Sequence, residues 1–329
     1  MARPAADRSA PALSAALGRL GRSLGLATAT GYIWLFYSER VFWSFWRAED
    51  GVAALLATWA VYSVAAHAAL IAIWRFHVRG LAAVLLIGAF FGWLIEGVFA
   101  MTLFGADGIP FPLTISWTGL AWHDLISVTI GWYALQLAMR RGPRPTAALA
   151  LGLGVFWGLW SLSWIAADRG ATPGLAAFAV HAFAATAAMI AASYAYCELR
   201  CSDFAPGRVE QALTAAVILA WLGGLTLPRL GARAIVLVPL FGLLWWGLRR
   251  TRATATGPDL LALLAAPIDR RSVPVLLLMP AAAALIYSLC RTAGLTPATN
   301  ILVFVITTPA GFIALIAGLV AVCRRTRRI

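Results

Sequence analysis

Residues 80–99 read GLAAVLLIGAFFGWLIEGVF, a run of apolar and small residues that contains a single ionisable side chain, Glu96. A helix of about twenty predominantly apolar residues is long enough to cross the hydrocarbon core of a bilayer. The run therefore predicts a membrane-spanning helix, and it puts one carboxyl group inside the membrane.

The composition of the whole chain agrees with this interpretation. Of the 329 residues, 62% are hydrophobic and only 12% are charged, and the mean hydropathy is +0.84. A soluble domain of this size needs far less apolar surface, so the chain is assigned to the polytopic integral membrane proteins. The predicted fold class is all-α, a helical bundle of about ten transmembrane helices. The predicted spans are 25–47, 51–74, 80–104, 114–139, 146–167, 174–197, 209–228, 233–248, 273–293 and 298–322.

The charged residues predict the topology. All 26 basic residues are arginines, and the formal net charge is +13. These arginines lie in short loops between apolar stretches, which favours topology signals and lipid-headgroup contacts over nucleic-acid binding. The basic loops alternate with loops that carry acidic residues such as Glu49, Asp50 and Asp107. The positive-inside rule then predicts two cytoplasmic termini and a multi-pass protein of the inner (plasma) membrane, with membrane lipids and no nucleic acid as partners.

Two regions follow from this pattern. Residues 1–24 form a basic cytoplasmic N-terminal segment in which leucines recur at helical spacing, which predicts a short interfacial helix. Residues 25–325 form a single transmembrane bundle. Its first half, 25–200, holds nearly all ionisable groups at membrane depth, and its second half, 209–325, is mostly apolar.

Five ionisable residues fall at one depth in four predicted spans. A rise of 1.5 Å per residue places them about 10–15 Å below the outer surface. A charged side chain at a helix centre costs about 2.5–3.5 kcal/mol, so such residues need a partner or a function. This layer contains Glu39, Glu96, His123, Asp124 and His181. A sixth residue, His67, lies nearer the inner side, and we expect it to be a hydrogen-bonded core histidine.

The helix faces predict how the layer is assembled. Gly88, Gly92 and Glu96 are each four residues apart, as are Gly119 and His123, so both ionisable groups share a face with small residues. Such faces allow close helix contacts, so Glu96 and His123 are expected to point toward neighbouring helices and away from lipid.

The acidic residues of this layer outnumber the arginine beside them. Glu39 and Arg40 diverge by about 100° on a helix and cannot pair, so Arg40 is expected to reach Asp124 or Glu96. Three acidic residues against one arginine leave two negative charges, which protons or a bound cation must neutralise. Glutamate and histidine are suitable ligands for a divalent transition metal such as zinc, iron or manganese.

These arguments assign three sets of candidate site residues. The predicted catalytic residues are Glu39, Glu96, His123 and Asp124. The predicted metal ligands are Glu96, His123 and His181. The predicted substrate-binding residues are Arg40, Trp43, Trp93 and Trp122. Together with Trp117, these tryptophans are expected to line an apolar vestibule beneath the stiff loop 105–112, unless they only anchor the helices at the membrane interface.

The predicted function is an intramembrane enzyme, assisted by a metal or by acid–base groups, that acts on a lipid-like or apolar substrate. Four alternatives remain open at this stage. They are a proton-coupled small-molecule transporter, a non-catalytic membrane subunit, a bis-histidine haem site formed by His123 and His181, and a purely structural polar network.

Overall fold

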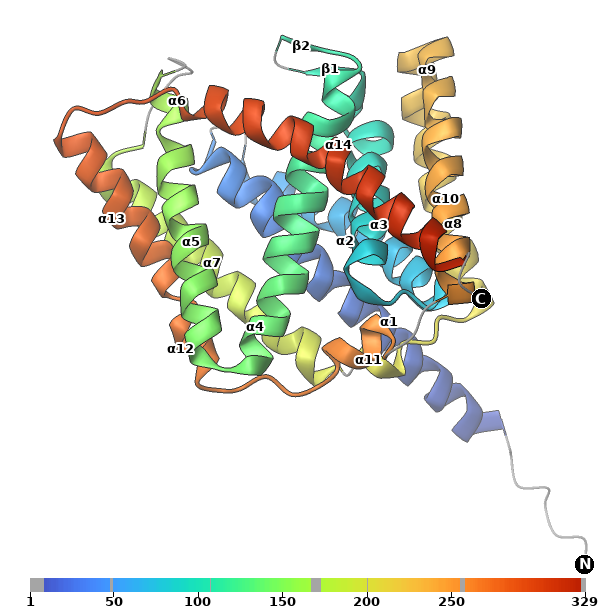
Figure 1. Ribbon diagram of the computed structural model, residues 1–329. Coiled ribbons are helices and arrows are strands. Elements are labelled where there is room, and N and C mark those ends of the chain that lie inside the picture. The colour runs from blue at the N-terminus through green and yellow to red at the C-terminus, as the bar shows by residue number, and fades with distance from the viewer. Residues whose placement is uncertain are drawn as a thin grey trace, which may run out of the picture.

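The computed structural model describes residues 9–47, 50–106, 108–166, 173–199, 201–254 and 258–326. These residues form a bundle of helices with one two-stranded hairpin at its edge (Figure 1). The predicted all-α class is therefore confirmed.

The N-terminal half contains the helices that build the interior of the bundle. α1 packs along α2 and α7, and α3 packs along the long helix η4. The α-helices of this half are α1 (Ser9–Leu35), α2 (Val52–Phe76), α3 (Gly80–Trp93), α4 (Leu135–Arg141), α5 (Pro143–Ser161), α6 (Ser163–Ala166) and α7 (Leu175–Glu198).

Three helical stretches of this half are π-helical, with wider turns than an α-helix. They are η1 (Phe36–Val41), η2 (Leu94–Phe99) and η4 (Ile115–Ala134). The remaining elements are the 3₁₀ turns η3 (Thr102–Phe104) and η5 (Cys201–Asp203) and the antiparallel strands β1 (Gly105–Ala106) and β2 (Ile109–Pro110).

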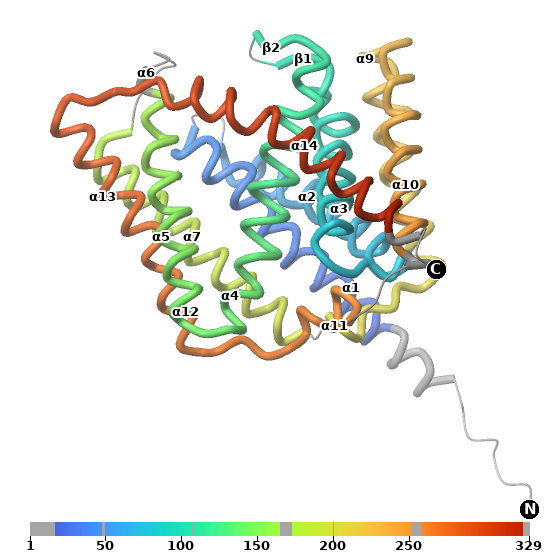
Figure 2. The backbone as a smooth tube through the Cα atoms, viewed as in Figure 1, coloured from blue at the N-terminus to red at the C-terminus, as the bar shows by residue number. Residues whose placement is uncertain are grey.

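The C-terminal half lies around this interior. Figure 2 follows α14 across the front of the bundle, where it packs against η4, α3 and α10. α13 packs against α5 and α7, at the left of the view in Figure 1. The elements of this half are α8 (Arg208–Trp221), π-helical η6 (Leu222–Thr226), α9 (Leu227–Leu230), 3₁₀-helical η7 (Gly231–Val236), α10 (Leu237–Thr254), α11 (Leu260–Leu264), α12 (Ser272–Val275), α13 (Leu278–Thr292) and α14 (Thr299–Thr326).

Within the described ranges, six helical segments are long and apolar enough to cross a membrane, which supports a membrane-embedded protein. They are Val52–Phe76, Gly80–Phe99, Leu175–Glu198, Arg208–Thr251, Ser272–Thr292 and Thr299–Arg324. The segment Arg208–Thr251 contains two predicted spans, and Figure 1 shows the chain reversing direction at α9 between them. The count of ten spans, the cytoplasmic termini and the choice of membrane stay predictions.

The N-terminal segment is helical from Ser9 onward and continues without interruption into α1 up to Leu35 (Figure 1). Its interfacial position on the cytoplasmic side stays a prediction. The predicted residues 1–8 lie outside the described part of the chain.

Close packing of α3 against η4 sets the position of the polar residues. A Cβ atom added at Gly92 would lie 2.9 Å from the carbonyl carbon of Gly119 and 3.0 Å from the Cβ of His123. A Cβ atom at Gly88 would lie 2.7 Å from the Cγ of Asp124. Only glycine leaves room for such an approach, so the predicted contact between small-residue faces is confirmed.

His67 is a buried core residue on α2, as expected. Its Nε2 lies 3.0 Å from the hydroxyl of Ser23 on α1, and its Nδ1 lies 2.8 Å from the hydroxyl of Thr214 on α8. The imidazole therefore joins three helices through hydrogen bonds on both ring nitrogens.

Candidate functional site

The π-helical stretches supply the ionisable residues of the site. Ser38 and Glu39 lie on η1, Glu96 lies on η2 and His123 lies on η4. In η2 the wider turn is visible in the bond from the Ala100 amide to the carbonyl of Ile95, 2.7 Å away and five residues earlier. Single π-helical turns, such as those of η1 and η2, are rare and occur frequently at functional sites.

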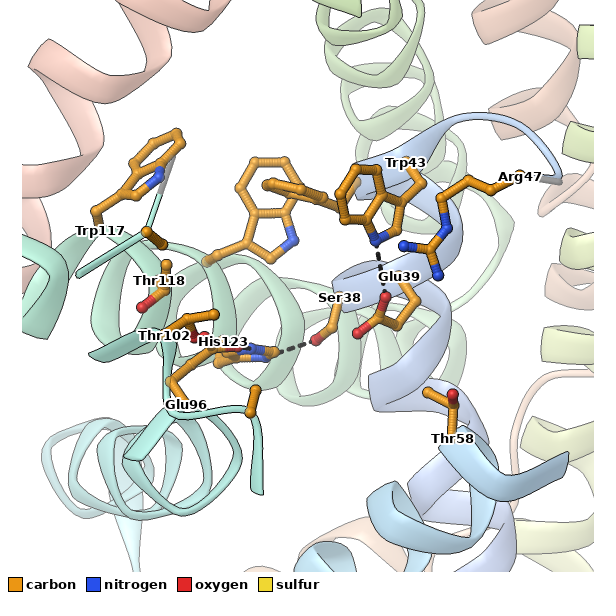
Figure 3. A pocket seen from close by; sticks show the side chains of 14 residues that line it. Ser38, Glu39, Trp43, Arg47, Thr58, Glu96, Thr102, Trp117, Thr118 and His123 are labelled. Carbon is orange, nitrogen blue, oxygen red and sulfur yellow. Dashed lines mark hydrogen bonds and ion pairs between the residues drawn. The ribbon is translucent and has the colours of Figure 1, made fainter. Parts of the chain in front are cut away.

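These side chains surround one cavity of about 320 Å³. Figure 3 shows Trp117 and Trp43 on opposite sides of it, with Ser38, Glu39 and His123 between them. Ala106 of strand β1 also borders the cavity, so the hairpin forms part of its rim. The lining residues are Ser38, Glu39, Phe42, Trp43, Arg47, Thr58, Glu96, Ala100, Thr102, Ala106, Trp117, Thr118, Trp122 and His123.

His123 is hydrogen-bonded through both ring nitrogens. Its Nε2 lies 2.5 Å from Oε1 of Glu96, and its Nδ1 lies 2.7 Å from the hydroxyl of Ser38. The other oxygen of Glu96 accepts a hydrogen bond from the hydroxyl of Thr102. The Ser38 hydroxyl also lies 2.8 Å from that of Ser127, one turn from His123 on η4. The imidazole is therefore fixed between an acid and a hydroxyl.

Glu39 is held by two neutral donors on the same side of the cavity. The hydroxyl of Tyr62 and the indole nitrogen of Trp43 each donate to one carboxylate oxygen, both at 2.9 Å. Among the described residues no cationic side chain contacts this carboxylate. A carboxylate has about four acceptor positions, so Glu39 retains capacity for a further donor.

The prediction that Arg40 reaches Asp124 or Glu96 is wrong. The Arg40 guanidinium is buried and lies 3.3 Å from Asp50, in the connection that follows η1. Asp50 is also bound at 2.9 Å by Arg47, whose guanidinium covers the ring of Trp43 at 4.4 Å. Arg47, and not Arg40, lines the cavity. Asp50 lies only ten positions after Arg40 in the chain, so the partner of Arg40 is local and not an acid of another helix.

Asp50 has a pKa below its ordinary value of 3.8. Burial by itself would raise this pKa, but hydrogen bonds from Arg47 and the charges of Arg47 and Arg40 outweigh burial and stabilise the carboxylate. The Asp50 charge therefore partly offsets both arginines near the rim of the cavity.

Asp124 does not line the cavity. Its carboxyl group is fully buried against Gly88 of α3, where Oδ1 accepts from the hydroxyl of Thr129 at 3.2 Å. Oδ2 has no hydrogen-bond partner among the described residues. Because consecutive side chains on a helix point in different directions, Asp124 faces α3 while its neighbour His123 faces the cavity.

His181 does not join Glu96 and His123. Its Nε2 bonds to the backbone carbonyl of Arg40 at 3.0 Å, and its ring packs against Trp46 and Trp157. In the described part of the chain no group of three or more His, Cys, Asp or Glu side chains is arranged to hold a metal ion. The predicted three-ligand metal set is therefore not assembled by these residues.

The tryptophans divide into two groups. Trp43, Trp117 and Trp122 line the cavity, as expected. Trp93 does not, since its ring is fully buried beside Gly119 and its nitrogen donates to the carbonyl of Ile115 at 3.1 Å. Trp93 fills the contact between α3 and η4.

Several lining or supporting residues had no place in the sequence interpretation. They are Ser38, Arg47, Tyr62 and Thr102. Hydroxyl groups cost little to bury and give no signal in an inventory of ionisable residues. Ser38 nevertheless lies directly before Glu39 in FYSER, and its position beside an intramembrane acid was the available signal.

Comparison with known proteins gave no match among family models, curated proteins or solved structures. The function must therefore be argued from the site itself.

Proposed function

We propose that the protein is an intramembrane acid–base enzyme that cleaves or transfers a group of a lipid-like substrate, with His123 as the base. The observation that carries the proposal is the chain of contacts from Ser38 to His123 and from His123 to Glu96, at 2.7 and 2.5 Å, on the wall of a cavity. A nucleophile within reach of a base that is oriented by a third group is the diagnostic arrangement of nucleophilic catalysis.

The roles follow from the positions of the protons. In the tautomer with a bare Nδ1, Ser38 donates to His123 and the Nε2–H of His123 donates to Glu96. Ser38 Oγ then attacks the acyl carbon of the substrate while its proton passes to Nδ1. The imidazolium gives that proton to the leaving oxygen or nitrogen, and a water or a second hydroxyl compound later cleaves the acyl–serine bond. Glu96 orients the ring and stabilises its positive charge.

The cavity suits a substrate that reaches it from the bilayer. Its walls combine the rings of Phe42, Trp43, Trp117 and Trp122 with a few polar groups, as is typical of small-molecule sites. Its volume of about 320 Å³ accommodates a headgroup and the bond beside it, and not a whole lipid.

Proton-coupled transport is less well supported. A transporter needs ionisable groups that continue from the site toward the other membrane face. The nearest further acid, Asp124, is sealed between α3 and η4, where its oxygen faces Gly88. This closed contact favours a site that opens to one side only.

The proposed activity is tested by measuring whether the protein releases acyl groups from lipids. Purified protein in lipid nanodiscs is incubated with a polar lipid extract, and released acyl groups are followed by mass spectrometry. We expect time-dependent release by the wild type and by Ser202→Ala, which alters an exposed serine, and loss of at least about a hundredfold in Ser38→Ala and His123→Gln. If release persists in Ser38→Ala but not in His123→Gln, the nucleophile is a water molecule activated by His123 and not Ser38. The proposal fails if the wild type releases nothing, or if His123→Gln is as active as wild type.

A further inference from the structure

The inference concerns the substrate class and rests on the proposed function, because it takes the same cavity as the substrate site. We propose that the cavity binds the positively charged ammonium headgroup of an amphiphile, with Glu39 as its counter-ion and tryptophan faces as its walls.

The balance of charge is the first argument. Among the described residues, six acidic or basic side chains lie in or directly beside the cavity, and three of them are carboxylates, Glu39, Glu96 and Asp50. The opposing cations are Arg40 and Arg47, so one negative charge remains when His123 is neutral, as the proposed base must be.

That negative charge is centred on Glu39. Glu96 contacts His123, and Asp50 contacts both arginines. Glu39 receives hydrogen bonds only from the neutral groups of Tyr62 and Trp43 among the described residues. A bound cation would provide the counter-charge that none of the described side chains brings into contact with Glu39.

The aromatic wall is the second, independent argument. Ammonium groups are attracted to the faces of tryptophan rings, and aromatic cages recognise quaternary ammonium compounds in this way. Trp117 and Trp122 line the cavity with ring centroids 6.3 Å apart, and Phe42 lies beside Trp122. The chain already uses this attraction at the rim, where the Arg47 guanidinium covers Trp43.

The arginines argue against an anionic headgroup. Arg40 is buried outside the cavity lining, and both Arg40 and Arg47 are directed to Asp50. A phosphate or sulfate would have to compete with Asp50 for them and would also lie near two carboxylates.

The size of the cavity limits what enters it. About 320 Å³ holds a small headgroup, so the alkyl part of the substrate must remain outside the cavity. The inferred substrate is therefore a single- or double-chain amphiphile with a small ammonium head.

The experiment compares three probes of equal chain length by calorimetry, with the full-length protein in uncharged nanodiscs. The probes are hexyltrimethylammonium, its uncharged analogue with a tert-butyl head, and hexyl sulfate. We expect the cation to bind about tenfold more tightly than its uncharged analogue, and the sulfate to bind most weakly. The preference should disappear in Glu39→Gln, decrease in Trp117→Leu and persist in Glu198→Gln, which alters an exposed glutamate at the end of α7.

Equal binding of the cation and its analogue by the wild type, tighter binding of the sulfate, or a preference that survives in Glu39→Gln would each overturn the inference. The wild-type comparison needs no variant and therefore does not depend on the folding of Glu39→Gln. Because binding is measured without turnover, cation binding by a protein that releases no acyl group would reject the proposed enzyme alone. Acyl release without a cation preference would reject the ammonium site alone.

Discussion

His123 Nε2 and Glu96 Oε1 lie 2.5 Å apart, although the two residues are 27 positions apart in the chain and belong to different helices. The contact exists because Gly92, one turn before Glu96, lets η4 approach α3 at the level of His123. A functional pair is thus positioned by a glycine that has no chemistry of its own.

The first prediction is that His123 and Glu96 act as one unit. His123→Gln and Glu96→Gln should each lower acyl release by about 10² to 10⁴-fold, since each removes part of one proton-transfer device. The double variant should be little worse than the more impaired single variant, because residues that act together are not additive. Initial rates of the four proteins form the double-mutant cycle, and additive losses would mean that the two side chains work separately.

Much of the fold could be predicted from the sequence, because apolar length determines which segments become membrane helices. Close helix contacts at Gly88, Gly92 and Gly119 were also predictable, since these glycines lie four or eight residues from Glu96 or His123 on the same helix face. Which helices meet at these faces was not predicted. Equal depth correctly grouped Glu39, Glu96 and His123 as residues of one cavity. Their catalytic roles remain predictions.

The direction of individual side chains was harder to predict. Hydropathy does not distinguish α- from π-helical turns, so the stretches η1, η2 and η4 had no sequence signal. Depth alone put Asp124 and His181 in the layer, but direction sends Asp124 to Gly88 and His181 to the carbonyl of Arg40. The ion-pair partner of Arg40 is Asp50, which lies in the connection after η1, so a search among the acids of other helices could not identify it.

A second prediction concerns the helix contact itself. Gly92→Ala should destabilise the protein by about 1–3 kcal/mol, because the new methyl group meets the backbone of Gly119 and cannot be accommodated by rotating a side chain. Gly152→Ala on α5 is the matched control, since a Cβ atom there meets nothing within 4 Å. Thermal unfolding followed by tryptophan fluorescence measures both, and equal melting temperatures would contradict the close approach.

Cys201 provides a third prediction, outside the predicted spans. Burial raises the pKa of its thiol from 9.0 to about 11, and the thiol lies 3.2 Å from the carbonyl of Leu261 on α11. Only about one thiol in a thousand is then ionised at pH 8, so maleimide should modify Cys201 very slowly in the folded protein. Mass spectrometry should find rapid modification after denaturation. Fast labelling of the native protein at pH 8 would show that η5 does not pack against α11 as described.

The fourth prediction is a dependence of stability on pH that arises from Asp50. Its pKa is lowered in the folded protein, so its ion pairs with Arg40 and Arg47 contribute stability above the ordinary pKa of 3.8. That contribution is lost as the pH falls through the lower, folded-state pKa. At neutral pH, Asp50→Asn should cost about 1–3 kcal/mol, because it removes the carboxylate that binds the buried Arg40 guanidinium. The difference in melting temperature between wild type and Asp50→Asn should therefore be largest at neutral pH and shrink below pH 4.

The control is Asp203→Asn at an exposed site, whose melting temperature should equal that of the wild type at every pH. A difference between wild type and Asp50→Asn that stays constant down to pH 2 would mean that the stabilisation does not come from the Asp50 charge.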